Sequence, residues 1–207
     1  MAGGDLGEGP MLAAATGAWI CFEDEAGQAL RPPKARTWAR RGHTPVVSVS
    51  GKGSGRVSVA GLVCLRSGAR GHLFYRMRVH RGRKGERRSM SEADYASLIA
   101  AAHHQLQNPL IVIWDNLNTH LSAVMHEFTG AHPDWLTVIQ PPAYAPELNP
   151  VEGLWASTKN GLGNLAARTA DQLAAVIRTR LKRIQYRPDL INGFLGQTGL
   201  SLEPEPP

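Results

Sequence analysis

The chain has 207 residues, of which 43% are hydrophobic and 19% charged, and these values suit a single globular domain. Its 23 Lys and Arg outnumber its 17 Asp and Glu, and the net charge of +6 favours a polyanionic partner such as nucleic acid. Apolar runs stay well short of the roughly 18 residues that cross a bilayer. The acidic N-terminus is also unlike a signal peptide, so we expect a cytoplasmic protein with no membrane partner.

The first predicted element is a strand over 19–22. It follows 16 residues rich in Gly and Ala, which we interpret as a flexible leader, and it runs into three consecutive acids at 23–25. Acids after a strand usually belong to a solvated loop. Strand alternation nevertheless puts Asp24 on the same face as Phe22, so Asp24 is a candidate site residue.

Residues 31–41 combine prolines, basic residues and an aromatic, which predicts an ordered loop outside the core. Basic side chains beside an aromatic can bind a phosphate backbone and stack on a base. Trp38 could equally anchor the loop to the core. The candidates for nucleic-acid contact here are Arg36, Trp38, Arg40 and Arg41.

Two strand-like runs, 56–65 and 72–80, predict an antiparallel hairpin that forms a meander with the first strand. The densest basic run of the chain follows them, opposed only by Glu86. Charge runs usually form a solvated surface, but such an imbalance favours contact with DNA. The predicted contacts in this run are Arg81, Arg83, Lys84, Arg87 and Arg88.

A capping pattern at 89–92 predicts a helix over 91–106, followed by a short apolar strand, 110–114, that ends in Asp115. The strand has no period of two, as expected when helices cover both faces of a sheet. Ligands gather at the carboxyl ends of such strands. If the first strand is a parallel neighbour, Asp24 and Asp115 meet there.

A further helix over 120–130 and a strand over 135–139 precede a loop with four prolines. In the next helix Asn149 fits the N-cap, Pro150 the first position and Glu152 the third. An acid in the first turn interacts favourably with the helix dipole, and this effect alone explains the presence of an acid at Glu152. The alternative is that the stiff loop aims Glu152 at the two aspartates. An amphipathic helix from Thr169 completes the chain.

Three segments, 22–27, 114–120 and 144–155, resemble the catalytic domain of mariner-like DDE transposases, in particular the bacterial insertion-sequence branch. The most specific part is Pro-x-Leu-Asn-Pro-x-Glu-x-x-Trp over 146–155. The similarity spans 17–195 and includes Lys159, which we add to the predicted nucleic-acid contacts. The remaining residues, 196–207, are expected to be a disordered tail.

The resemblance implies an α/β protein with a ribonuclease-H-like fold, in which helices flank a mixed five-stranded sheet. It also implies a catalytic and metal-binding triad of Asp24, Asp115 and Glu152, holding two Mg²⁺ or Mn²⁺ ions, with Asn116 and His120 in support. The expected activity is cleavage of DNA at transposon ends and strand transfer to target DNA, carried out by a homodimer.

Three alternatives remain open from the sequence. A ribonuclease or junction resolvase would use the same fold and carboxylates. A truncated, non-catalytic DNA-binding remnant would retain only the basic surface. Members of this family carry helix-turn-helix domains before the catalytic one. For this chain, another reading frame is a candidate source of such a domain. A receiver-like or phosphatase-like domain is disfavoured by the hairpin over 56–80.

Overall fold

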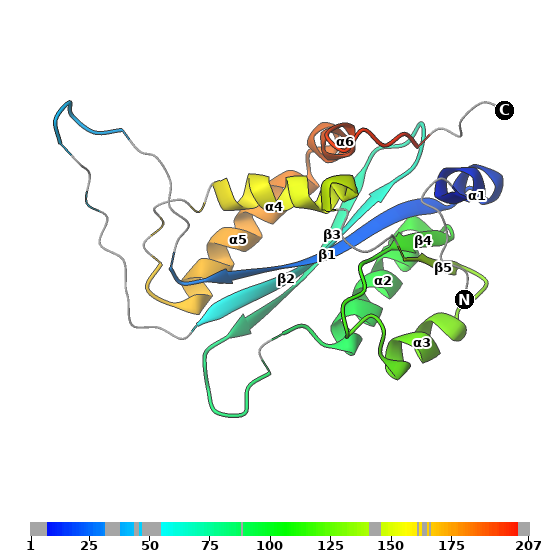
Figure 1. The fold of residues 1–207 in the computed structure, drawn as a ribbon, viewed down its shortest axis with the longest axis horizontal. Helices are drawn as coiled ribbons and strands as arrows, with labels where there is room; N and C mark the ends of the chain where they lie inside the picture. Colours follow the sequence, from blue (N-terminus) through cyan, green and yellow to red (C-terminus); the bar gives the residue numbers. More distant parts are fainter. Residues whose placement is uncertain are drawn as a thin grey trace.

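The computed structural model describes residues 8–31, 38–43, 46, 55–87, 89–140, 146–160, 162, 165 and 167–202. Its centre is a mixed five-stranded sheet with the order β3-β2-β1-β4-β5 (Figure 1). The strands are β1 (Trp19–Ala29), β2 (Arg56–Leu65), β3 (His72–His80), β4 (Leu110–Ile113) and β5 (Leu136–Ile139). β1, β2 and β3 form an antiparallel meander, whereas β4 and β5 run parallel to β1. The predicted α/β, ribonuclease-H-like sheet is confirmed.

Helices cover both faces of the sheet (Figure 1). One face carries α4 (Pro150–Asn160), α5 (Ala170–Gln185) and α6 (Pro188–Gly196), and the other carries α2 (Glu92–Leu106) and α3 (Ala123–Gly130). Each face buries its own apolar cluster. Ile20 and Phe22 enter the cluster under α4 and α5, while Trp19 and Cys21 enter the cluster under α2. None of the helices in the described part of the chain is long and apolar enough to cross a membrane.

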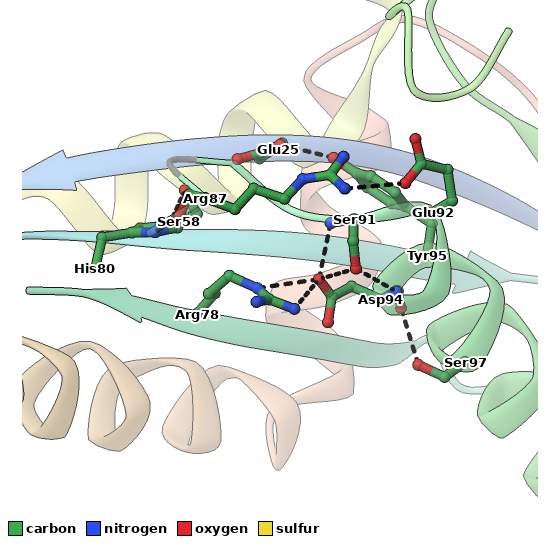
Figure 2. A network of polar contacts seen from close by, with 10 residues as sticks. All are labelled: Glu25, Ser58, Arg78, His80, Arg87, Ser91, Glu92, Asp94, Tyr95 and Ser97. Carbon is green, nitrogen blue, oxygen red and sulfur yellow. Dashed lines mark hydrogen bonds and ion pairs between the residues drawn. The ribbon is translucent and has the colours of Figure 1, made fainter. Parts of the chain in front are cut away.

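The capping residues explain where the helices begin. Asn149 Oδ1 accepts a hydrogen bond from the Val151 N–H at 3.0 Å, as its predicted N-cap role requires. Thr169 caps α5 in the same way. The capping box of α2 pairs Ser91 with Asp94, two residues beyond the predicted pattern at 89–92 (Figure 2). Asp94 fits better because it also binds Arg78 at 2.7 Å.

Several segments are more regular than the sequence predicts. β1 continues past its apolar half to Ala29, because β2 pairs with it from Ile20 onwards. Within the supposed leader, Glu8–Thr16 form helix α1, whose Ala-rich sequence favours a helix without showing an amphipathic pattern. Beyond residue 195, Leu200 and Leu202 still pack against the cluster under α5. A short 3-10 helix, η1 (Pro146–Leu148), precedes α4.

Candidate active site

Two of the three predicted carboxylates lie level on neighbouring strands. β1 pairs in parallel with β4, with Phe22 opposite Ile113, so that two residues further along Asp24 comes level with Asp115. Both line a cleft with a volume of about 260 Å³. The cleft is formed by Asp24, Glu25, Gly27, Arg56, Asp115, Leu117 and His120. The register therefore brings the two aspartates together as predicted.

Asp24 lies within β1 and points toward α4. The indole Nε1 of Trp155 donates a hydrogen bond to Asp24 Oδ2 at 2.8 Å, and the Glu25 N–H donates to Oδ1 at 2.8 Å. Burial raises the pKa of Asp24 to about 6, and repulsion from Glu152 and Asp115 adds to this rise, while the bond from Trp155 opposes it. A bound cation would relieve this repulsion.

Trp155 can reach Asp24 because β2 has a glycine at the facing position. Gly61 is the partner of Asp24 in the β1–β2 register. A Cβ atom on Gly61 would lie 2.9 Å from Cη2 of Trp155, so a larger residue would push the indole off the strand. Trp155 belongs to the signature in the sequence, but its role as a donor to Asp24 depends on this tertiary contact.

We expect Trp155→Phe to raise the pKa of Asp24 by about one pH unit, because the ring is retained while a hydrogen bond to the ionised carboxylate is lost. Carboxyl ¹³C NMR titration in EDTA measures this pKa directly. Trp19→Phe is the matched control, since Trp19 is also buried in β1 and its Nε1 has no hydrogen-bond partner among the described residues. An unchanged Asp24 titration in Trp155→Phe would contradict the proposed contact.

Asp115 is the second residue after the end of β4, and its side chain is 64% exposed. Oδ1 accepts hydrogen bonds from the Leu117 N–H at 3.1 Å and from Nδ1 of His120 at 3.0 Å. The bond from His120 is the main reason that the pKa of Asp115 lies below its ordinary value. His120 therefore contacts Asp115, and its supporting role in the site stays a prediction. The neighbouring Asn116 is exposed.

The other edge of His120 meets a carboxylate that the sequence did not single out. Nε2 lies 3.0 Å from Oε2 of Glu23, and both side chains are buried. Trp114 stacks on the imidazole with ring centroids 4.8 Å apart, and Tyr95 contacts it edge-on at 4.7 Å. His120 thus bridges a buried carboxylate and an exposed one.

The electrostatics of this bridge favour a charged imidazole. Burial alone would lower the pKa of His120, but Asp115 and Glu23 outweigh it and raise the pKa to about 10. Burial raises the pKa of Glu23 to about 7, although the nearby imidazolium opposes this rise. Strand alternation was the available signal for Glu23, because residue 23 shares the face of Trp19 and Cys21, which α2 covers.

Glu152 lies in the first turn of α4 and is exposed. Its backbone N–H donates to the Asn149 carbonyl at 3.1 Å, as expected for the start of a helix. Its charge contributes to the raised pKa of Asp24, yet no three His, Cys, Asp or Glu side chains in the described ranges are grouped to hold a metal ion. The oxygen ligands of Asp24 and Asp115 nevertheless suit a hard divalent cation, which would offset their repulsion.

Two of the predicted nucleic-acid contacts form ion pairs with acidic side chains. Arg81 binds Asp171 at 2.7 Å, and Arg87 binds Glu92 at 3.2 Å (Figure 2). Trp38 is 99% exposed, so it does not anchor its loop to the core. Arg40, Arg41, Arg83, Lys84 and Lys159 are also exposed, whereas Arg36 and Arg88 lie outside the described residues. Contact with DNA remains a prediction for all of them.

Comparisons with known proteins agree with this geometry. The model of a family described as "DDE superfamily endonuclease" matches residues 19–174. The match to the Mos1 mariner paired-end complex with Mg covers 87% of this chain and 53% of the Mos1 chain. The sequence identity is 14% and the TM-score is 0.59. The match to a pre-cleavage Mos1 transpososome covers 94% of this chain and 62% of the Mos1 chain, with 12% identity and a TM-score of 0.55.

The Mos1 paired-end complex with the left transposon end matches over 89% of this chain, with 15% identity and a TM-score of 0.54, and the chain covers 56% of that transposase. The chain thus spans between 53% and 62% of the length of these three solved structures. A comparison with curated protein sequences gave no match. The matched region contains Asp24, Asp115 and Glu152, and it covers most of the chain. The fold is similar to that of the Mos1 transposase, and the chain belongs to the DDE superfamily endonucleases.

Proposed function

We propose that this chain is the catalytic domain of a DNA transposase, which cleaves DNA at transposon ends and joins the freed end to target DNA. One observation carries the proposal: Asp24 and Asp115, which the parallel register of β1 and β4 brings to the same level, line one cleft. Together with membership of an endonuclease family, this pair favours phosphodiester chemistry. We assign the catalytic domain to residues 17–195 and place the chain in the bacterial insertion-sequence branch.

Asp24, Asp115 and Glu152 would hold two Mg²⁺ or Mn²⁺ ions. Carboxylate oxygens are the ligands that these cations prefer. Mos1 paired-end complexes contain Mn in one case and Mg in another, which supports the same choice here. When bound, such ions would activate the attacking oxygen and stabilise the leaving one.

The chain's own residues position the carboxylates for this role. Trp155 fixes Asp24 through its indole N–H, and His120 fixes Asp115 through Nδ1. Because His120 is held by the buried Glu23, the exposed Asp115 keeps one orientation and remains ionised. The Mos1 structures are complexes with transposon ends, so we infer the same kind of DNA partner, bound by a homodimer.

A strand-cleavage assay tests this function. A labelled duplex carrying the element's own terminal repeat is incubated with the chain in Mg²⁺, Mn²⁺ or EDTA, beside the Asp24→Ala variant. We expect metal-dependent nicks with 3′-hydroxyl ends, and joining of those ends to a second duplex, from the unmodified chain alone. Salt-sensitive binding without cleavage would instead indicate the non-catalytic remnant. Preference for RNA–DNA hybrids or four-way junctions would indicate a ribonuclease or resolvase.

A further inference from the structure

We propose that Arg56 is a phosphate-binding residue of this cleft, whose guanidinium donates to a non-bridging oxygen of the DNA strand that is cut. Arg56 is the first residue of β2 and pairs with Ala29 of β1. Its side chain lines the same cleft as Asp24 and Asp115. The inference rests on the proposed function and adds to it a residue that contacts the substrate.

A glycine makes room for the guanidinium over β1. A Cβ atom built on Gly27 would lie 2.9 Å from Nη2 of Arg56 and 3.6 Å from its Cζ. Gly27 is two strand positions beyond Glu25 and three beyond Asp24. The absence of a side chain at this position therefore lets the guanidinium approach Gly27 on the strand that also carries Asp24.

A buried hydroxyl fixes the orientation of Arg56. Nη2 donates to Oγ of Ser58 at 3.2 Å, and Ser58 is fully buried. Ser58 Oγ also lies 3.2 Å from Nε2 of His80, whose Nδ1 lies 2.6 Å from the Arg87 carbonyl oxygen (Figure 2). The carbonyl only accepts, so Nδ1 carries the proton and, in the neutral ring, Nε2 accepts from Ser58. The Ser58 oxygen is then left as the acceptor for Arg56.

The charge of Arg56 is not neutralised by a carboxylate within the described residues. Arg78, Arg81 and Arg87 each form an ion pair there, whereas Arg56 forms none within 4.0 Å. A guanidinium has five N–H donors in a planar fork that matches two phosphate oxygens, and Ser58 takes only one of them. An oriented cation that lines the same cleft as two carboxylates, with donors that no described residue takes, suits a phosphate anion, because the carboxylates would otherwise repel the DNA backbone.

The test compares Arg56→Ala, Arg56→Lys and Gly27→Ala with Arg66→Ala as the matched control. Arg66 follows the other end of β2, about 30 Å away at the usual rise per residue, and stacks on Trp19. Binding of the terminal-repeat duplex is measured in Ca²⁺ over a range of salt concentrations. We expect Arg56→Ala to bind at least about tenfold more weakly and to lower the salt slope by about 0.9, as for one lost phosphate contact. Arg66→Ala should keep the slope.

Methylphosphonate substitution then identifies the contact. Neutralising the scissile phosphate or one of its neighbours should weaken binding by the unmodified chain but not further weaken binding by Arg56→Ala. Gly27→Ala keeps the charge and should show the same loss of methylphosphonate sensitivity, because it displaces the guanidinium. Equal sensitivity of Arg56→Ala and the unmodified chain at every phosphate would overturn the proposal. Cleavage by the unmodified chain is scored separately. A result that rejects the Arg56 contact can therefore be told apart from a result that rejects the nuclease function.

Discussion

Asp115→Asn should reduce metal-dependent DNA cleavage by about a thousandfold or more. The asparagine side chain has the same shape, and its amide oxygen can still accept from Leu117 and His120, so the local geometry is retained. What is lost is the negative charge that a divalent cation requires. Initial cleavage rates of a labelled duplex in Mg²⁺ at neutral pH measure the effect.

The fold should survive this substitution. Asp115 is 64% exposed, and an exposed charge contributes no more than about 1 kcal/mol to the free energy of unfolding. Urea unfolding in EDTA checks this point. Asp134→Asn is the control, because Asp134 is an exposed aspartate in the turn before β5 and is outside the cleft. Cleavage at the normal rate by Asp115→Asn would remove Asp115 from the site.

The positions of Asp115 and Glu152 in their elements could be predicted from the sequence because local patterns determine them. An apolar run without alternation identified β4 and placed Asp115 just past its end. Asn149 and Pro150 located the start of α4, and hence Glu152 in its first turn. Neither signal depends on a distant part of the chain.

The supporting contacts could not be predicted because they join distant segments. Glu23 lies among three consecutive acids, which is typical of a loop, and although strand alternation indicates its face, only the structure shows His120 as its partner. Arg56 needed both Gly27 and the buried Ser58 to become a candidate. Trp155 is part of the sequence signature, but only the β1–β2 register places Gly61 beside Asp24 and so leaves room for its indole. Strand register is the missing information in each case.

Glu23→Gln should lower the free energy of unfolding by about 3 kcal/mol or more, since it leaves the buried imidazolium of His120 without its buried counter-ion. The Nε2–Oε2 distance of 3.0 Å and the burial of both side chains make this the strongest ionic contact of the site. Asp115→Asn is a matched control, because it removes the exposed carboxylate from the same imidazole and should cost far less. Urea unfolding at pH 8 in EDTA, where Glu23 is ionised and His120 is protonated, measures both.

The pH dependence of stability separates an ion pair from simple packing at this position. Because the pKa of His120 rises from 6.5 in the unfolded chain to about 10 in the folded one, its stabilising contribution is complete below pH 6.5 and is lost as the pH approaches 10. Glu23 acts in the same direction at lower pH, since its pKa rises from 4.5 to about 7 on folding. We therefore expect stability to fall between pH 6.5 and 10 in the unmodified chain. The fall should be smaller in Glu23→Gln, where His120 keeps only Asp115 as a carboxylate partner that favours its protonated form. Parallel pH profiles for the two proteins would show that the buried contact is not an ion pair.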